Sequence, residues 1–169
     1  PINKNTLSGL NYCILDKKNK INKKVSDYIS ITVGGSNNGK YLQKIIKLIT
    51  DKKFYNYRFK VLYGEFFSKN DISSLKKYEN YDNLIIKKFD KKTLYSSKIV
   101  ILTYGLTTYE CIYYNIPTIN LFRNNDHMIK LIALKKIIPW VDVLKSYNIY
   151  SLNKKIKLLL STDSKSSYI

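Results

Sequence analysis

Short apolar runs alternate with longer amphipathic segments along most of this chain. The apolar runs are rich in β-branched and aromatic residues and predict strands at Tyr28–Val33, Phe59–Tyr63, Asn83–Lys87, Ile99–Leu102, Thr118–Phe122 and, at an edge, Trp140–Val143. The segments between them predict helices at Lys40–Thr50, Asp71–Tyr78 (capped by Asp71), Lys91–Ser96, Thr107–Asn115, His127–Lys136 and Ser151–Leu160. Strands that alternate with helices through short connections favour the α/β class, a doubly wound parallel sheet covered on both faces.

The fourth predicted strand and the helix after it form the most informative stretch. The strand ends in a turn at Gly105, and Thr107 and Thr108 can cap the helix that follows. Glu110 is then expected in the first helical turn, where the helix dipole favours a carboxylate, and Pro117 ends the helix before the next strand. A strand, a tight glycine turn and a helix N-terminus with free N–H groups predict an anion site at the carboxyl end of the strand.

A glycine-rich loop follows the first predicted strand and precedes the first predicted helix. Its residues Gly34, Gly39 and Lys40 fit the nucleotide-binding pattern GxxxxGK, but Tyr41 stands where a hydroxyl should hold Mg²⁺. We therefore disfavour a true P-loop. Two interpretations stay open: a plain strand-to-helix turn, or a loop whose glycines let the backbone approach a phosphate closely.

Both loops follow parallel strands, so they open at the same edge of the sheet, where ligands of this fold class bind. Backbone N–H groups and hydroxyls suit a diphosphate, and a carboxylate suits the two hydroxyls of a ribose. Together the loops predict a nucleotide-diphosphate site that needs no metal and no other cofactor. The residues that form it are Gly34, Gly35, Ser36, Gly105, Thr107, Thr108 and Glu110.

The chain has 169 residues and a formal net charge of +18, which would suit a nucleic-acid ligand. The basic residues, however, are nearly all lysine. Arg58 and Arg123 are the only arginines, whereas recognition of bases and phosphates relies heavily on arginine forks. Lysine, asparagine, isoleucine and tyrosine are abundant together, as in proteins from AT-rich genomes. We therefore disfavour nucleic acid as the partner and expect the charge to assist binding of an acidic ligand such as a diphosphate.

Length and residue usage are typical of a globular protein with one ordinary domain. No apolar run approaches the roughly 18 residues that a membrane span needs. Cys13 and Cys111 have no metal-ligand spacing, so we expect no metal and a reducing, cytoplasmic setting. We expect a linker over residues 1–27, the folded domain over 28–160 and a polar tail over 161–169. Because the chain opens with proline and not methionine, we suspect a fragment of a longer protein.

The GGS after the first predicted strand and the later LTYGLTTYECIYYNIPTI resemble the C-terminal domain of GT-B-type nucleotide-sugar enzymes. The nearest resemblance is to the bacterial UDP-sugar hydrolase of the pseudaminic acid pathway, close kin of the family 28 glycosyltransferases. It extends upstream to SGLNYCILDKK, similar to the interdomain crossing of that hydrolase, and downstream to FRNN, and so covers roughly residues 8–142. The resemblance implies a Rossmann-like domain that forms one half of a GT-B enzyme.

The resemblance also implies roles for residues of the two loops. Gly35 and Ser36 would line the diphosphate of the nucleotide. Thr107 and Thr108 would bind phosphate oxygens, and Glu110 would hold the ribose. In the resembled family the ligand is a UDP-sugar, so uridine is the base that this resemblance favours.

Residues outside the two loops gain roles in the same way. The backbone from Ile86 to Phe89 would face the uracil, and Asn124 and Asn125 would lie near the sugar. The sequence departs from the family pattern at Asn37, where aspartate is common, and at Asn125, where glutamine is usual. These departures put the identity of the sugar in doubt more than the binding of the nucleotide.

No catalytic residue is predicted in this chain. The resembled hydrolase carries its base, a histidine, in an N-terminal domain that has no counterpart here. His127 is the only histidine of the chain and is expected as a partly exposed residue near a helix start. Tyr104 and Tyr109 flank the predicted site and could stack on a base, although tyrosine more often packs at the half-buried surface.

Three functions therefore stay open. The first is the UDP-sugar-binding domain of a hydrolase of bacterial surface or flagellar sugar biosynthesis, which cleaves the sugar C1–O bond and releases UDP. The second is the UDP-sugar-binding half of a family 28-like glycosyltransferase that needs a partner chain. The third is a basic binding module without catalysis. In the first two, the missing N-terminal domain or a partner chain would supply the catalytic base.

Overall fold

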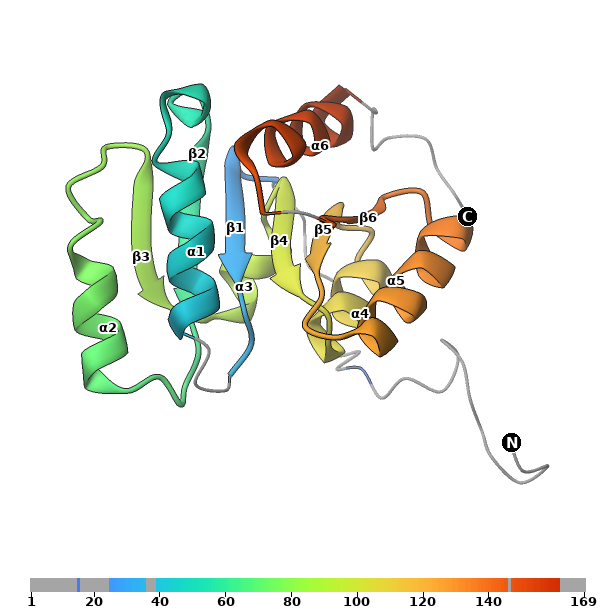
Figure 1. The fold of residues 1–169 in the computed structure, drawn as a ribbon, viewed down its shortest axis with the longest axis horizontal. Helices are drawn as coiled ribbons and strands as arrows, with labels where there is room; N and C mark the ends of the chain where they lie inside the picture. Colours follow the sequence, from blue (N-terminus) through green and yellow to red (C-terminus); the bar gives the residue numbers. More distant parts are fainter. Residues whose placement is uncertain (1–14, 16–24, 36–38, 146, 162–169) are drawn as a thin grey trace.

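A computed structural model describes residues 15, 25–35, 39–145 and 147–161 of the chain. The described residues form one sheet in which every neighbouring pair of strands is parallel, in the order β3-β2-β1-β4-β5-β6 (Figure 1). The strands are β1 (Tyr28–Thr32), β2 (Arg58–Tyr63), β3 (Leu84–Lys88), β4 (Ile99–Thr103), β5 (Thr118–Leu121) and β6 (Val141–Val143). The predicted fold class, an α/β Rossmann-like doubly wound sheet, is confirmed.

The helices lie on both faces of the sheet (Figure 1). They are α1 (Gly39–Ile49), α2 (Lys69–Lys76), α3 (Lys91–Tyr95), α4 (Leu106–Tyr113), α5 (Asn125–Ile137) and α6 (Ile149–Ser161), with a short 3-10 helix, η2, at Lys52–Phe54. Apolar residues of α1, α2 and α6 share one buried cluster, and those of α3 and α4 share a second. The sheet therefore separates two cores.

Strand β4 lies between these two cores, and all five of its residues are buried. Ile99 and Ile101 belong to the cluster under α1, α2 and α6, while Val100 and Leu102 belong to the cluster under α3 and α4. Alternate side chains of a strand point to opposite faces, so both faces of β4 must be apolar. The continuous apolar run in the sequence is explained by this position.

The strand order reverses direction between β1 and β4. The chain builds outward from β1 through β2 to β3 and then returns to the other side of β1, where Thr32 pairs with Leu102. In open parallel sheets the loops on the two sides of such a switch point diverge, leaving a crevice at the carboxyl ends of the strands. The two glycine turns predicted from the sequence lie at this edge of the sheet, one after β1 and one after β4.

Helices α2, α5 and α6 each begin two residues earlier than the sequence pattern predicts; α6 begins at Ile149 and not at Ser151. Helix α2 begins at Lys69 and is capped by Ser68, whose Oγ accepts a hydrogen bond from the Asp71 N–H at 3.1 Å; the predicted cap, Asp71, is the third helical residue. Helix α5 begins at Asn125 and not at His127. Serine, aspartate and asparagine all serve as N-caps, so a polar cluster leaves the start of a helix undetermined by a few residues.

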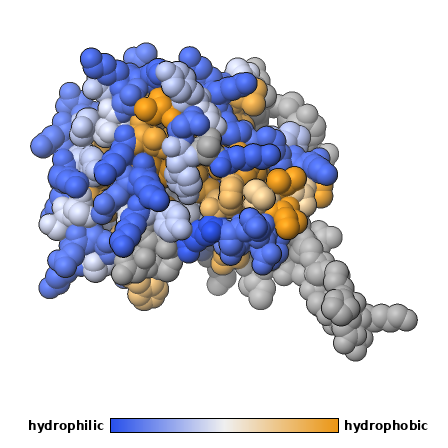
Figure 2. Space-filling model, in the orientation of Figure 1, coloured by the Kyte–Doolittle hydropathy of each residue, from blue (hydrophilic) through white to orange (hydrophobic). Residues whose placement is uncertain are grey.

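Hydrophilic side chains cover most of the surface in the view of Figure 2, and hydrophobic ones gather over α5. Helix α5 buries only Leu131, while Ile129 and Ile137 are 63% and 72% exposed. Cys111, by contrast, is fully buried in α4. In the described part of the chain, no helix is both long and apolar enough to cross a membrane.

Candidate functional site

The loop after β1 lies on one side of the switch point. Gly34 has a φ of +86°, in the left-handed region that glycine adopts readily, and Gly35 follows it. The predicted diphosphate residue Ser36 lies outside the described residues, as does Asn37. The chain leaves β1 through a turn that depends on glycine, so the backbone itself is the surface that this loop offers to a ligand.

A further glycine, Gly64, fixes where this loop lies. Gly64 ends β2, and a Cβ placed on it would lie 2.5 Å from the carbonyl oxygen of Gly34 and 2.6 Å from Cα of Gly35. The backbone N–H of Phe66 also donates to the carbonyl oxygen of Gly35 at 3.2 Å. The turn after β2 is thus packed backbone to backbone against the loop after β1, a contact that only glycine permits.

The first turn of α4 follows β4, on the other side of the switch point. Gly105 is the N-cap, with an extended φ of 171°. Thr107 and Thr108, both predicted as caps, lie inside the helix, but the Thr108 hydroxyl does accept from the N–H of the N-cap residue, as in a capping box. The N–H groups of Leu106 and Thr107 have no acceptor among the described residues. Helix dipole and free donors together make this turn suited to an anion.

The two threonines of this turn have different environments. Thr108 is fully buried, and its hydroxyl donates to Oδ1 of Asn120 at 2.9 Å while accepting from the Gly105 N–H at 3.3 Å. Thr107 is half-buried. The hydroxyl of Thr108 therefore points into the protein, beneath the turn, and Thr107 is the threonine whose hydroxyl a phosphate could reach.

Glu110 was predicted in the first turn of the helix. It is the fifth residue of α4 and so lies just beyond that turn. It is only 8% exposed. Its Oε1 accepts a hydrogen bond from the Tyr95 hydroxyl at 3.4 Å and pairs with Nζ of Lys91 at 3.3 Å. Burial, and after it the charge of Glu110, raises the pKa of Tyr95 well above its usual range, so this hydroxyl stays a donor.

The second carboxylate oxygen of Glu110 is differently placed. No donor among the described residues contacts Oε2, and Oε2 is not among the buried side-chain atoms that lack a hydrogen-bond partner, so it keeps some contact with solvent. One oxygen is thus fixed by α3 while the other can still accept hydrogen bonds. A carboxylate held in this way is suited to a ligand that presents hydroxyl groups.

The segment predicted to face the uracil lies at the end of β3. Ile86 and Phe89 are both half-buried but pack on opposite faces of the sheet. Phe89 contacts the cluster that contains Tyr95, on the same face as α3 and α4, whereas Ile86 packs against the other core. The structure therefore places Phe89, and not the side chain of Ile86, on the face that carries Glu110.

Both asparagines predicted near the sugar follow β5 at the same edge of the sheet. Asn124 is the N-cap of α5, and its Oδ1 accepts a hydrogen bond from the His127 N–H at 2.9 Å. Asn125 is the first residue of that helix, and both side chains are exposed. Their position is compatible with a ligand at this edge, but the side-chain oxygen of Asn124 is already used as the N-cap of α5.

Arg123 is a site residue that the sequence analysis considered only for nucleic-acid binding. Its Nη2 donates to the carbonyl oxygen of Val33 at 3.0 Å and lies 3.3 Å from Oγ1 of Thr103. It therefore reaches from the end of β5 across the end of β4 to the end of β1. Its guanidinium also lies 5.9 Å from the ring centroid of Tyr41 in α1. A permanent positive charge is thus fixed at the switch point.

An aromatic cluster lies between the starts of α4 and α5. The hydroxyls of Tyr104 and Tyr109 share a hydrogen bond, and the ring of His127 lies 5.1 Å from that of Tyr104, between centroids. His127 is half-buried at the third position of α5, as predicted. The two tyrosine hydroxyls bond to each other, and whether either ring stacks on a base stays a prediction.

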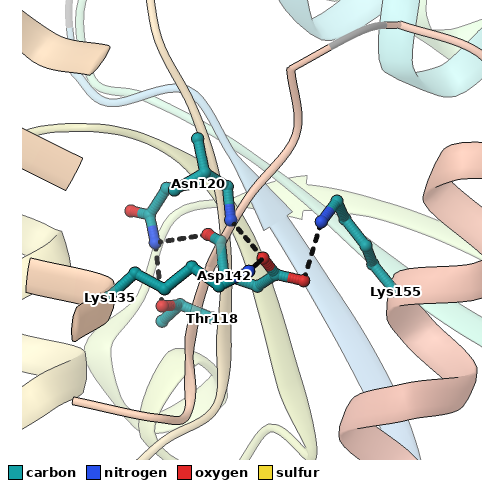
Figure 3. A network of polar contacts seen from close by, with 6 residues as sticks. Thr118, Asn120, Lys135, Asp142 and Lys155 are labelled. Atoms are coloured by element: carbon teal, nitrogen blue, oxygen red, sulfur yellow. Dashed lines mark hydrogen bonds and ion pairs between the residues drawn. The ribbon is translucent and has the colours of Figure 1, made fainter. Parts of the chain in front are cut away.

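A network of polar contacts joins β5 to β6, the strand at the edge of the sheet (Figure 3). Asp142 of β6 is almost fully buried, with Oδ1 bound to Nζ of Lys135 at 2.5 Å and Oδ2 bound to Nζ of Lys155 at 2.9 Å. Burial alone would raise the pKa of Asp142, but the hydrogen bonds from both lysines outweigh it and hold that pKa below its usual range. These pairs fasten α5 and α6 to β6.

The described residues include no group of three or more His, Cys, Asp or Glu side chains that could hold a metal ion. The hydrogen-bond donors at the carboxyl edge of the sheet are an arginine, backbone amides and a threonine hydroxyl, and one buried carboxylate lies on the helix that carries these amides. Such a set can bind a phosphorylated ligand through direct hydrogen bonds.

Two solved structures of the UDP-GlcNAc 2-epimerase of Methanocaldococcus jannaschii share this fold. One, in complex with UDP-GlcNAc and UDP, has a TM-score of 0.60 and 14% identity, and covers 83% of this chain and 40% of that chain. The other has a TM-score of 0.56 and 16% identity, and covers 92% of this chain and 42% of that chain. This chain thus spans about two fifths of the epimerase. No family model and no curated protein matches the sequence.

Proposed function

We propose that this chain is the UDP-sugar-binding half of a nucleotide-sugar hydrolase of bacterial surface sugar biosynthesis. The observation that carries the proposal is the juxtaposition, at one edge of the sheet, of three ligand-binding features. These are the guanidinium of Arg123, the free amides that begin α4, and the buried carboxylate of Glu110 with one accessible oxygen. The first two suit the diphosphate of UDP, and the third suits its ribose.

The diphosphate binds between the two glycine turns. The N–H groups of Leu106 and Thr107 donate to one phosphate, assisted by the dipole of α4 and the Thr107 hydroxyl. Arg123 contributes the charge that two phosphate groups need, because an arginine fork can donate to phosphate oxygens while Nη2 stays bound to Val33. The backbone of Gly34 and Gly35 allows a close approach from the other side.

The nucleoside lies over the face that carries α3 and α4. Oε2 of Glu110 accepts hydrogen bonds from the ribose hydroxyls, while Tyr95 and Lys91 hold Oε1 in place. The uracil then lies toward the end of β3, beside Phe89, which packs on that same face. This arrangement favours ribose over deoxyribose, since the carboxylate needs hydroxyl donors.

Hydrolysis breaks the bond between the sugar C1 and the β-phosphate oxygen, and a water oxygen forms the new bond to C1. Negative charge develops on the departing UDP, where Arg123 and the α4 amides stabilise it. The proton of the attacking water must pass to a base. We assign that base to a second domain, because this chain spans about two fifths of the epimerases whose fold it shares.

The proposal is tested by calorimetric titration of the chain with UDP, with CMP and ATP as controls, at two salt concentrations and without Mg²⁺. We expect UDP to bind preferentially and its affinity to survive the higher salt concentration. Binding that is unselective and falls steeply with salt would instead indicate a basic nucleic-acid or polyanion module. If UDP binds, incubating a UDP-sugar with this chain and the proposed second domain together separates hydrolysis, which yields free sugar, from transfer to an acceptor.

A further inference from the structure

Asn120 is a fully buried polar residue in the middle of β5 (Figure 3). Both ends of its side-chain amide are bonded. Nδ2 donates to Oγ1 of Thr118 at 2.9 Å and to the carbonyl oxygen of Asp142 at 3.3 Å, and Oδ1 accepts from the Thr108 hydroxyl at 2.9 Å. Among natural side chains of this size only asparagine supplies a donor and an acceptor in this geometry.

Through Thr108, the side chain of Asn120 is linked to the turn at Gly105. The Thr108 hydroxyl gives its proton to Asn120, so its oxygen is left to accept from the Gly105 N–H at 3.3 Å. Gly105 therefore directs its N–H inward, and the N–H groups of Leu106 and Thr107 are the donors that remain at the start of α4. The buried amide of Asn120 thereby determines which amides of the turn face a ligand.

The other end of Asn120 is held by a rigid support. The carbonyl that accepts from Nδ2 belongs to Asp142, whose carboxylate is fixed by Lys135 of α5 and Lys155 of α6. Strand β5 also pairs with both β4 and β6. Strands β5 and β6 are held by several contacts, whereas the turn at Gly105 is held by few. A substitution at Asn120 should therefore displace the turn at Gly105 more than it displaces the strands.

We propose that Asn120 is a positioning residue for phosphate binding, acting through Thr108 and Gly105 on the amides that begin α4. This inference rests on the proposed function for its ligand, since the turn is assigned there to the diphosphate of UDP. It assigns Asn120 a role beyond stability: the residue selects the donors of the anion site without touching the ligand.

The test compares Asn120→Leu with Asn83→Leu. Asn83 is a matched control because its side chain also donates two hydrogen bonds, to the carbonyl oxygens of Phe54 and Tyr57, but at the amino-terminal edge of the sheet. For each variant of the full chain we would measure affinity for UDP and for uridine, the thermal midpoint, and hydrogen exchange of the Gly105 amide by ¹⁵N NMR. Thr108→Val, which removes the same link, serves if Asn120→Leu does not fold.

We expect Asn120→Leu to weaken UDP binding roughly tenfold to a hundredfold, the range for hydrogen bonds to a charged group, and to change uridine affinity less than about twofold. The Gly105 amide should be protected from exchange in the native chain and lose that protection. Asn83→Leu should lower the thermal midpoint while leaving the ratio of the two affinities and the Gly105 amide unchanged.

Equal losses of UDP and uridine affinity in Asn120→Leu, or no loss at all, would overturn the proposal and leave Asn120 a stabilising residue only. If the native chain binds no UDP, the proposed function fails, and the Gly105 amide then decides the positioning role by itself. An amide that exchanges freely in the native chain, or equally slowly in Asn120→Leu, would refute that role.

Discussion

The Nη2 atom of Arg123 lies 3.0 Å from the carbonyl oxygen of Val33, a residue ninety positions earlier in the chain. The contact joins the end of β5 to the end of β1 and crosses the end of β4, where Oγ1 of Thr103 lies 3.3 Å from the same nitrogen. It fixes a positive charge at the switch point of the sheet, at the edge where both glycine turns open.

Arg123→Gln should weaken UDP binding roughly tenfold to a hundredfold, because a charge-assisted contact to the diphosphate is lost. Uridine, which lacks phosphates, should bind the variant and the native chain alike. Arg58→Gln is the matched control, since it removes the other arginine, an exposed residue at the amino-terminal end of β2. Calorimetry that gives both variants the same UDP affinity would remove Arg123 from the site.

Glu110→Gln should weaken both UDP and uridine, because the ribose is common to the two ligands. We expect a loss of roughly 1.5–3 kcal/mol of binding free energy, typical of hydrogen bonds to a charged group. The native chain should prefer UDP over 2′-deoxy-UDP, and the variant should lose most of that preference. Glu65→Gln changes an exposed carboxylate that pairs with Lys88, and it should alter neither quantity. A variant that discriminates as well as the native chain would contradict ribose binding by Glu110.

Gly64→Ala should destabilise the fold and distort the loop after β1. The added methyl carbon would lie 2.5 Å from the carbonyl oxygen of Gly34, so backbone must move, at a cost of roughly 1–3 kcal/mol by analogy with overpacked cores. At Gly105 an added Cβ meets no atom within 4 Å and φ is extended, so Gly105→Ala should cost less. Urea unfolding measures both, and equal losses would show that the Gly64 contact is not restrictive.

The ion pairs of Asp142 should make stability depend on pH in acid. The pKa of this carboxyl is lower in the folded chain than its ordinary value of 3.8, so its contribution is fully present above that value and is lost as pH falls through the folded-state pKa. The difference in unfolding free energy between the native chain and Asp142→Asn should therefore be largest above about pH 5 and shrink toward pH 3.

Urea titrations at several pH values measure this difference. Asp82→Asn, at an exposed residue before β3, is the control and should leave the stability nearly unchanged at every pH. A difference between the native chain and Asp142→Asn that stays constant from pH 7 to pH 3 would show that the two lysines do not stabilise the folded carboxylate.

Much of the fold follows from local signals in the sequence. The β4 strand could be predicted because burial on both faces favours the continuous apolar run Ile99–Leu102. The turns at Gly34 and Gly105 could be predicted because glycine is common in turns. The starts of α2 and α5 were wrong by about two residues, since Ser68 and Asp71 are both good caps and only packing chooses between them.

The site was predictable only where its residues belong to one short motif. Gly105, Thr107 and Glu110 are neighbours in sequence, so their closeness in space follows from a strand, a turn and a helix. The roles of Arg123 and Gly64 depend on contacts with Val33, Gly34 and Gly35, which are far away in the sequence. No local sequence pattern predicts such contacts.

Thr108 belongs to the local motif, yet its environment is also set by a residue outside that motif. The resemblance implies that its hydroxyl binds phosphate oxygens, but in the structure this hydroxyl donates to Asn120, twelve residues away in β5. The helical period alone cannot show this, because it depends on which residue of the next strand lies beneath the turn.

A ¹⁵N NMR titration of the chain with UDP tests the central claim most directly. The account predicts that the largest shifts fall on the amides of Gly35, Leu106 and Thr107 and on the Nε of Arg123, all at the carboxyl edge of the sheet. Shifts concentrated instead around Arg58 and Lys98, at the opposite edge, or spread over the surface lysines, would contradict the assignment of the nucleotide site.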